Sequence, residues 1–456
     1  MDLQQELLSK HVGLPESIQV YRVTQIPTRF ETGTVFTFGD IKSTEYTHGM
    51  HVYPAKFVPQ IPRWAFRYAA VAQGKVVLDP FCGSGTTLVE ARISGLNSYG
   101  IDMDPLARLL SRVKSTPLYM ERPEFLYQAA QNLLGQIKKD RSKVKLDSQS
   151  DVNLHYNWKF WFSIETMQEL IRIKRNIRSF EPPAISTESD WEQISEFFLC
   201  CLSSIIKRVS YLADEQIKVR LSHEKLKKGV PKPLFAFRQA LNKHVPNMIR
   251  FTQMCSRFTT FANVIGEDAR KIPLENKSVD LIVTSPPYLN AMDYPFAHKH
   301  NLFILDLLKP GQYRPHSRRY IGVSERVLLK KMFDAKHSCG DPVIDQYIDR
   351  IYSGGSDVDK NRAYIVWEYF TDMKSVLAEC FRVLESGSHM VIFVGDNRIR
   401  KQYVPTHEIL NHIASQTGFE VETFFYHQMK NKILGVGRNV TGGEIQREMA
   451  TVLRKP

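Results

Sequence analysis

A glycine-rich turn between a short apolar strand and a helix constrains the fold of this 456-residue chain more than any other feature. The turn is DPFCGSGTT (79–87); an apolar strand (75–79) precedes it and a helical run (86–94) follows. Its two glycines permit positive φ and let a ligand approach the backbone, and the free amides at a helix start suit a negative group. A second predicted strand (98–102, SYGID) ends in Asp102, whose carboxylate can accept both hydrogen bonds of a ribose diol. The pattern predicts a β-α-β unit that binds a nucleotide-like ligand at its strand ends.

Two later stretches repeat the alternation of strands and helices. Residues 279–284 (VDLIVT) predict a strand that runs directly into the tetrapeptide SPPY (285–288). Further along, the periodicity predicts a helix over 368–384, a strand over 388–394 and a closing strand over 449–453. Strands alternating with helices predict a Rossmann-like α/β fold with a doubly wound, mainly parallel sheet.

Two segments interrupt this alternation. Residues 121–255 are predicted to be largely helical, because apolar side chains recur every three or four residues over 191–212. The same segment holds 22 Lys and Arg against 15 Asp and Glu, about half of the excess in a chain of net charge +13. Residues 306–365 form a shorter, irregular interruption that contains several arginines. We expect both segments to be insertions in one α/β domain.

Composition narrows the class of protein. A strongly basic surface favours polyanions, because each phosphate contact releases condensed counterions, although a merely soluble basic protein has the same composition. The sequence has no apolar run long enough for a transmembrane helix, and its polar N-terminus lacks the core of a signal peptide. We therefore expect a cytoplasmic protein with no membrane partner. The six cysteines form no CxxC pair, so no zinc site and no disulfide framework are expected.

At the positions described above the sequence resembles the DNA amino-methyltransferases. DPFCGSGTT (79–87) resembles their motif I, GIDMDP (100–105) their motif II and SPPY (285–288) their motif IV. HVYPAKF (51–57) and GEDA (266–269) resemble motifs X and III. The resemblance covers about half of the chain and implies S-adenosyl-L-methionine as the cofactor. The cofactor-binding residues that it implies are Lys56, Phe57, Asp79, Pro80, Phe81, Cys82, Gly83, Ser84, Gly85, Thr86, Thr87, Asp102, Met103, Asp268 and Ala269.

The tetrapeptide SPPY supplies the residue types that methylation of an amino group needs. An exocyclic amine on cytosine or adenine is a poor nucleophile, because its lone pair is delocalised into the ring. Ser285 and the carbonyl of Pro286 can accept its two hydrogens and aim the lone pair at the methyl group. Pro287 stiffens the backbone and brings no competing donor, and Tyr288 offers a face on which a flipped base stacks. These four residues are the predicted catalytic residues.

The order of the motifs, with X first, then I to III, an insertion and IV, resembles that of the α group, in which the insertion recognises the target. We therefore predict five segments: an N-terminal segment with the cofactor-binding half (1–120), a basic helical insertion for target recognition (121–255), a catalytic half (256–305), a second insertion (306–365) and a C-terminal part (366–456). The residues predicted to contact double-stranded DNA are Arg172, Lys174, Arg175, Lys227, Lys228, Arg318 and Arg319.

The target base follows less directly from the motifs. Ser at the first position of motif IV resembles the enzymes that methylate N4 of cytosine, whereas Asp or Asn is more usual for N6 of adenine. Methylation of a ring carbon needs a cysteine that attacks the base covalently, and the family that this sequence resembles carries it in a Pro-Cys dipeptide; none of the six cysteines here follows a proline. An RNA amino-methyltransferase and a DNA-binding protein without catalysis stay open as alternatives, whereas no carboxylate cluster suggests a metal-dependent nuclease. In a bacterial or archaeal cell, a restriction endonuclease that cuts the same site is a candidate partner.

Overall fold

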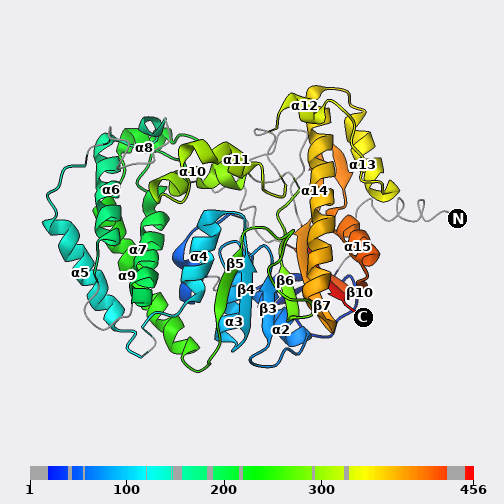
Figure 1. The fold of residues 1–456 in the computed structure, drawn as a ribbon, viewed down its shortest axis with the longest axis horizontal. Coiled ribbons are helices and arrows are strands. Elements are labelled where there is room, and N and C mark those ends of the chain that lie inside the picture. Colours follow the sequence, from blue (N-terminus) through cyan, green and yellow to red (C-terminus); the bar gives the residue numbers. More distant parts are fainter. Residues whose placement is uncertain are drawn as a thin grey trace.

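A nine-stranded sheet with helices on both faces forms the centre of the part of the chain that the structure describes (Figure 1). The computed structural model describes residues 19–39, 44–54, 57–119, 121–144, 146, 157–181, 188–214, 219–289, 293–322, 328–428 and 447–456. Successive residues of a strand point to opposite faces of the sheet. Val77 accordingly belongs to the apolar core under α2 (Gln60–Tyr68), whereas Leu78 belongs to the core under α14 (Asp357–Val383).

The strands follow the order β1-β2-β10-β11-β7-β6-β3-β4-β5 across the sheet. Neighbours from β7 to β5 are parallel, β11 is antiparallel to both β7 and β10, and β2 and β1 continue in parallel beyond β10. The bounds are β1 Val20–Val23, β2 Val35–Phe38, β3 Val76–Asp79, β4 Asn97–Ile101, β5 Ala262–Gly266, β6 Val279–Thr284, β7 Leu384–Gly395, β10 Glu420–Gln428 and β11 Arg447–Arg454. A separate hairpin joins β8 (Asn397–Ile399) to β9 (Gln402–Val404). The mainly parallel sheet confirms the predicted fold class.

The helices have the following bounds: α3 Thr86–Ile93, α4 Pro105–Ser115, α5 Phe125–Lys139, α6 Ile164–Arg178, α7 Glu188–Ile206, α8 His223–Lys228, α9 Pro233–Cys255, α10 Tyr294–Ile304, α11 Tyr313–Ser317, α12 Lys330–Phe333, α13 Pro342–Tyr352 and α15 Thr406–Thr417. Short 3₁₀ turns lie at η1 (Tyr46–Met50), η2 (Trp158–Phe160) and η3 (Pro310–Gln312). No helix in the described ranges is long and apolar enough to cross a membrane.

The helices α5 to α9 form a layer beside the sheet, on the left of Figure 1. Their buried side chains form one apolar core with Leu106 to Val113 of α4 and with Leu302 to Leu308 at the end of α10. The basic insertion is therefore packed on α4, which follows β4, and on α10, which follows the SPPY segment (285–288). The predicted helical face over 191–212 is correct as far as Ile206, where α7 ends; Leu212 instead pairs with Leu221 in a short β-bridge.

The second insertion differs from its prediction at its C-terminal end. The helix expected over 368–384 starts at Asp357, so the segment boundary predicted at 366 falls within one continuous helix. Ser356 accepts from the Asp359 amide and the Asp359 carboxylate accepts from the Ser356 amide, a reciprocal cap that sets the start of α14. The division of the chain into functional segments otherwise stays a prediction.

Candidate functional site

A cavity lies where the carboxyl ends of β3, β4, β5 and β6 meet. Ligands bind at this edge of parallel sheets because the loops that leave the strands converge there. The cavity brings together residues from the predicted motifs I, II, III and IV. Its lining consists of Tyr53, Pro80, Phe81, Gly83, Asp102, Met103, Asp104, Glu267, Asp268, Ala269, Ser285, Pro287, Tyr294, Arg319, Tyr320 and Ile321.

Asp79 organises the turn rather than facing the cavity. Its buried carboxylate accepts hydrogen bonds from the hydroxyls of Thr87 and Thr284, each at 2.7 Å, and from the Phe81 amide at 3.1 Å. Burial raises the pKa of Asp79 to about 6, and these three donors favour the ionised form. Three donors of the chain itself thus bind this carboxylate, and Asp79 is not among the residues that line the cavity, so a direct contact with the cofactor stays a prediction.

Some of the other residues of the turn line the cavity, and the rest are buried behind it. Pro80, Phe81 and Gly83 line the cavity, whereas Cys82, Ser84, Thr86 and Thr87 are buried and do not line it. The buried ammonium of Lys114 donates to the Ser84 carbonyl and, at 3.3 Å, to its hydroxyl. None of the predicted cofactor contacts Cys82, Ser84, Gly85, Thr86 and Thr87 lines the cavity, and of these Ser84 and Thr87 bind side chains of the surrounding structure.

The two glycines of the turn are needed for different reasons. Gly85 has φ +80°, and a Cβ there would lie 2.7 Å from the Ser111 Cα, so only glycine lets α3 and α4 approach this closely. Gly83 has φ +49°, and a Cβ there would meet the ring of Tyr53 at 3.5 Å, an ordinary contact. The bare backbone at Gly83 leaves the cavity wall open to a ligand.

Asp102 is held in position by the backbone at the end of β4. One carboxylate oxygen accepts from the Gly83 amide and the other from the Asp104 amide, both at 2.8 Å. Burial, together with the neighbouring Asp104 carboxylate, raises the pKa of Asp102 to about 7. Each oxygen keeps a free lone pair, and the side chain lines the cavity, as its predicted role in binding a ribose diol requires.

Asp104 connects the cavity to the helix that follows the catalytic loop. It caps α4 through the amides of Leu106 and Ala107, and its carboxylate lies 2.5 Å from Nδ1 of His298 on α10. Burial alone would raise the pKa of Asp104, but His298 and the helix amides outweigh burial and lower it. The His298 ring packs 4.8 Å from that of Tyr53 between ring centres.

A chain of ion pairs borders the cavity beyond β5. Asp268 is bound by the guanidinium of Arg270, which also reaches Asp372 at 3.0 Å. Burial alone would raise the pKa of Asp268, but Arg270 outweighs burial and lowers it, so this carboxylate is ionised. Glu267 pairs with Arg108 at 2.9 Å and with Arg319 at 3.1 Å. Arg319, predicted to contact DNA, therefore lies on the wall of the cavity.

The loop SPPY (285–288), which carries the predicted catalytic residues, follows β6 directly. Ser285 and Pro287 line the cavity, and Pro286 is buried beneath them. The hydroxyl of Tyr288 donates to the carboxylate of Glu448 on β11, which also lies 3.3 Å from Nδ1 of His427. The Tyr288 ring is thus fixed against the sheet by its polar end. This anchor depends on β11, which is 160 residues away in the sequence.

The segment that resembles motif X contributes a different residue from those predicted. Tyr53 lines the cavity, and its ring lies 6.3 Å from that of Tyr294 in a stacked orientation. Phe57 instead packs against Phe393 in the core under α2, so its predicted contact with the cofactor does not fit. Lys56 lies outside the described residues.

The residues predicted to contact DNA differ in how far their side chains are exposed. Lys174 is buried and pairs with Asp306 at 2.8 Å, so its predicted phosphate contact does not fit. Arg318 is half-buried against Met332. Arg172 and Arg175 are also half-buried on α6, and Arg172 pairs with Glu169 at 3.2 Å. Lys227 and Lys228 are exposed on α8, where Lys228 pairs with Glu224.

Several cavity residues were not predicted: Tyr53, Asp104, Glu267, Tyr294, Tyr320 and Ile321. Tyr53, Asp104 and Glu267 stand within or beside motifs that had been recognised, so proximity to those motifs was an available signal. Tyr294, Tyr320 and Ile321 reach the cavity only through the path of the chain after the catalytic loop, for which the sequence held no signal.

Comparison with known proteins places this arrangement in a family. The family model for DNA methylase, of the N6/N4 kind, matches residues 15–109 and 279–442, more than half of the chain. The chain belongs to the N6/N4 DNA methylase family. The unmatched residues 110–278 contain α5 to α9, so the methylase carries the helical insertion between its two matched parts.

The methylase has distant relatives of nearly its own length. The type II methyltransferase M.MvaI of Kocuria varians is 24% identical over 416 residues, which cover 87% of each chain. The type II methyltransferase M.BsoBI of Geobacillus stearothermophilus is 22% identical and covers 90% of this chain and 86% of its own. Among solved structures, an S-adenosylmethionine-dependent methyltransferase of Methanosarcina mazei covers 89% of this chain and 98% of its own, with 10% identity and a TM-score of 0.29.

The cofactor of this methylase is S-adenosylmethionine. The residues of the cavity fit that group. Asp102 presents two oriented acceptor oxygens to a diol, and Gly83 leaves a wall that a side chain would otherwise fill. Asp268 supplies an ionised carboxylate to the same cavity, where an amino group of the cofactor would find an acceptor. Among the described residues no cluster of His, Cys, Asp and Glu has the arrangement of a metal site.

Proposed function

We propose that this DNA methylase transfers a methyl group to the exocyclic N4 of a cytosine that is flipped out of duplex DNA. The observation that carries the proposal is the position of Ser285. It follows β6 directly, lines the same cavity as Asp102 and Gly83, and is held there by the bond from Thr284 to Asp79. A neutral acceptor thus stands beside the cofactor site, where a target amine must lie.

The residues of the SPPY loop have separate roles in the proposed reaction. S-adenosylmethionine, when bound, supplies an electrophilic methyl group on a sulfonium sulfur. The hydroxyl oxygen of Ser285 and the carbonyl oxygen of Pro286 accept the two amino hydrogens and turn the nitrogen lone pair toward the cavity. Ser285 is a weak base, so the proton that the amine loses passes on to water. Tyr288, anchored through Glu448, presents its ring to the flipped base.

A type II modification role is the second part of the proposal. The full-length relatives M.MvaI and M.BsoBI are both type II methyltransferases, and this chain aligns with them over most of its length. A short match to a tRNA (guanine(10)-N2)-dimethyltransferase of Methanocaldococcus jannaschii, 39% identical, covers only 12% of this chain. Double-stranded DNA is therefore the substrate that we propose, with a restriction endonuclease of the same specificity as the expected partner.

Genomic DNA from cells that express the chain tests the proposal. The DNA is digested to nucleosides, and N4-methylcytosine and N6-methyladenine are measured by mass spectrometry, with Ser285→Ala as the matched inactive control. N4-methylcytosine in the wild type and not in the control is the expected result. N6-methyladenine would refute the assignment of cytosine, and the absence of both marks would refute the assignment of DNA as substrate.

A further inference from the structure

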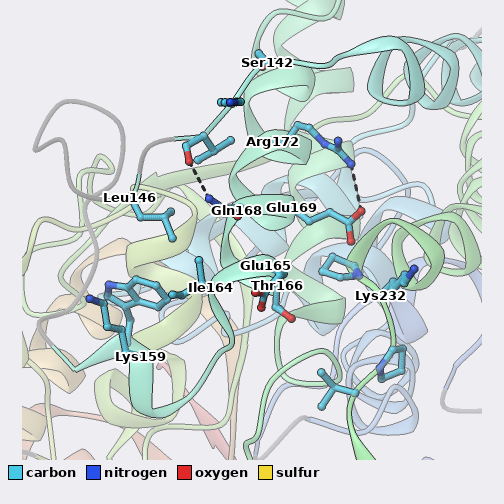
Figure 2. A pocket seen from close by; sticks show the side chains of 16 residues that line it. Ser142, Leu146, Lys159, Ile164, Glu165, Thr166, Gln168, Glu169, Arg172 and Lys232 are labelled. Atoms are coloured by element: carbon cyan, nitrogen blue, oxygen red, sulfur yellow. Dashed lines mark hydrogen bonds and ion pairs between the residues drawn. The ribbon is translucent and has the colours of Figure 1, made fainter.

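A second cavity, of about 970 Å³, lies within the helical insertion and contains none of the residues of the methyl-transfer site. It opens where α6 and α9 begin (Figure 2). Its floor is apolar, and Val144, Leu146, Trp158, Ile164 and Pro233 contribute to it. This volume lies within the range of cavities that bind ligands.

Three lysines from separate segments surround this cavity. Lys143 follows α5, Lys159 belongs to η2, and Lys232 precedes α9. All three are exposed, and none of them forms an ion pair within the described part of the chain. In Figure 2, Lys159 and Lys232 stand on opposite sides of the cavity with Ile164 between them. Cations that converge on one cavity without anionic partners repel one another unless an anion joins them.

The other charged residues of the cavity do not cancel the positive charge of the three lysines. Arg172 is neutralised by Glu169, whose other oxygen accepts from the Leu234 amide at the start of α9. Glu165 is exposed in the first turn of α6 and offsets one lysine. The cavity as a whole therefore keeps a net charge of about +2.

Two backbone hydrogen bonds and a short stretch of chain connect the wall of this cavity to the exposed basic helix α8. The Tyr211 amide donates to the Trp161 carbonyl just after η2, and the Ser222 amide donates to the Tyr211 carbonyl. Ser222 then caps α8, which carries Lys227 and Lys228, and the chain leads from α8 directly to the cavity wall at Val230. In Figure 1, α8 lies at the upper end of the helical layer, and α10 and α11 lie beside it along the upper side of the molecule.

We propose that this cavity binds the sugar-phosphate backbone of the duplex to one side of the target base. Lys143, Lys159 and Lys232 contact phosphate oxygens, and the apolar floor around Ile164 packs against deoxyribose. The inference rests on the proposed function, because it takes duplex DNA as the substrate. It adds a defined contact site, which fixes the register of the DNA on the insertion without reading bases.

Salt-dependent binding of a labelled duplex of mixed sequence tests this site. The triple variant Lys143→Gln, Lys159→Gln, Lys232→Gln should make the slope of log affinity against log salt shallower by roughly two to three, because each lost phosphate contact removes about 0.9. Affinity for S-adenosylmethionine should stay as in the wild type. The control variant Arg257→Gln, Lys277→Gln removes two exposed charges that precede β5 and β6, at the opposite edge of the sheet, and should leave the slope unchanged.

A gain of binding gives an independent test that does not depend on the folding of the triple variant. Glu165→Lys adds a cation at the mouth of the cavity and should tighten binding several-fold at low salt. An unchanged slope in the triple variant, or an equal loss per charge in the control, would overturn the inference. If the wild type methylates genomic DNA but the triple variant keeps the wild-type slope, the inference about this cavity is wrong and the proposed function still stands.

Discussion

The hydroxyl of Thr284 donates to the carboxylate of Asp79 at 2.7 Å, although the two residues are 205 positions apart in the sequence. Asp79 also binds Thr87 and the Phe81 amide, so one buried carboxylate fixes the cofactor turn. Thr284 immediately precedes Ser285, the residue that we propose binds the target amine. This hydrogen bond therefore adds a side-chain link between the turn and the start of the SPPY loop to the backbone pairing of β3 with β6.

Thr284→Val should separate these two functions. The variant keeps the shape of the side chain but leaves Asp79 with one donor fewer, and we expect a loss of about 1–2 kcal/mol in the free energy of unfolding. Because the start of the catalytic loop loses its link to the turn, kcat should fall at least tenfold while affinity for S-adenosylmethionine changes little. Thr87→Val is the matched control, since it removes a bond to the same carboxylate from the turn alone; equal kcat in both variants would contradict the argument.

Affinity for the cofactor should depend on pH through Asp102. Its pKa is raised from 3.8 to about 7, so the free protein is largely protonated at this carboxyl below pH 7. A ribose diol binds the ionised form, hence affinity should fall about tenfold for each pH unit below 7 and level off above pH 8. Calorimetry from pH 5.5 to 8.5 measures this dependence, and Asp102→Asn should give weak, pH-independent binding.

The same shift has an opposite effect on stability. A raised pKa in the folded state means that the contribution of Asp102 to stability is fully present below pH 3.8 and is lost as the pH rises through 7. Asp102→Asn should therefore raise the melting temperature relative to the wild type more at pH 8 than at pH 5.5. A pH-independent affinity in the wild type would show that Asp102 does not bind the cofactor as a carboxylate.

The fold was predictable where local pattern and tertiary structure agree. The apolar runs at β3 and β6 are buried on both faces, so their composition alone identifies them as central strands. The start of α14 was missed, although the cap at Ser356 and Asp359 is visible in the sequence, because it follows the loop-like run Ser353 to Gly355. The strands β1 and β2, each only four residues long, join the sheet through pairing that no local pattern encodes.

The site was predictable as a set of motifs and less so as a set of contacts. Motif resemblance assigns a role to a whole segment, but burial decides which side chains face the ligand. Cys82 and Thr87 stand in the recognised turn and yet point into the core, whereas Tyr53 stands four residues before the predicted Phe57 and lines the cavity. Lys174 belongs to a basic run, but the helical period places it on the buried face of α6 against Asp306.

The two glycines of the turn should respond differently to alanine. In Gly85→Ala the new Cβ would lie 2.7 Å from the backbone of Ser111 at φ +80°, so we expect a loss of about 3 kcal/mol or more in the free energy of unfolding. Gly83→Ala, at φ +49° with only an ordinary contact of 3.5 Å to the Tyr53 ring, should cost only about 1 kcal/mol. Its methyl group enters the cavity, so affinity for S-adenosylmethionine should fall tenfold or more. Thermal unfolding and calorimetry on both variants check this, and similar melting temperatures for the two would contradict it.

The ring and the hydroxyl of Tyr288 should be separable by substitution. Tyr288→Phe keeps the face on which a flipped base stacks and removes the bond to Glu448, so turnover should stay within about tenfold of wild type while stability falls by about 1–2 kcal/mol. Tyr288→Ala removes the ring as well, and turnover on DNA should fall at least a hundredfold, since a stacking contact with a base contributes about 1–3 kcal/mol in addition to the positioning it provides. Binding of S-adenosylmethionine should be unaffected in both, because Tyr288 does not line the cofactor cavity. Single-turnover methylation with saturating cofactor measures the difference; equal turnover in the two variants would show that the ring does not hold the base.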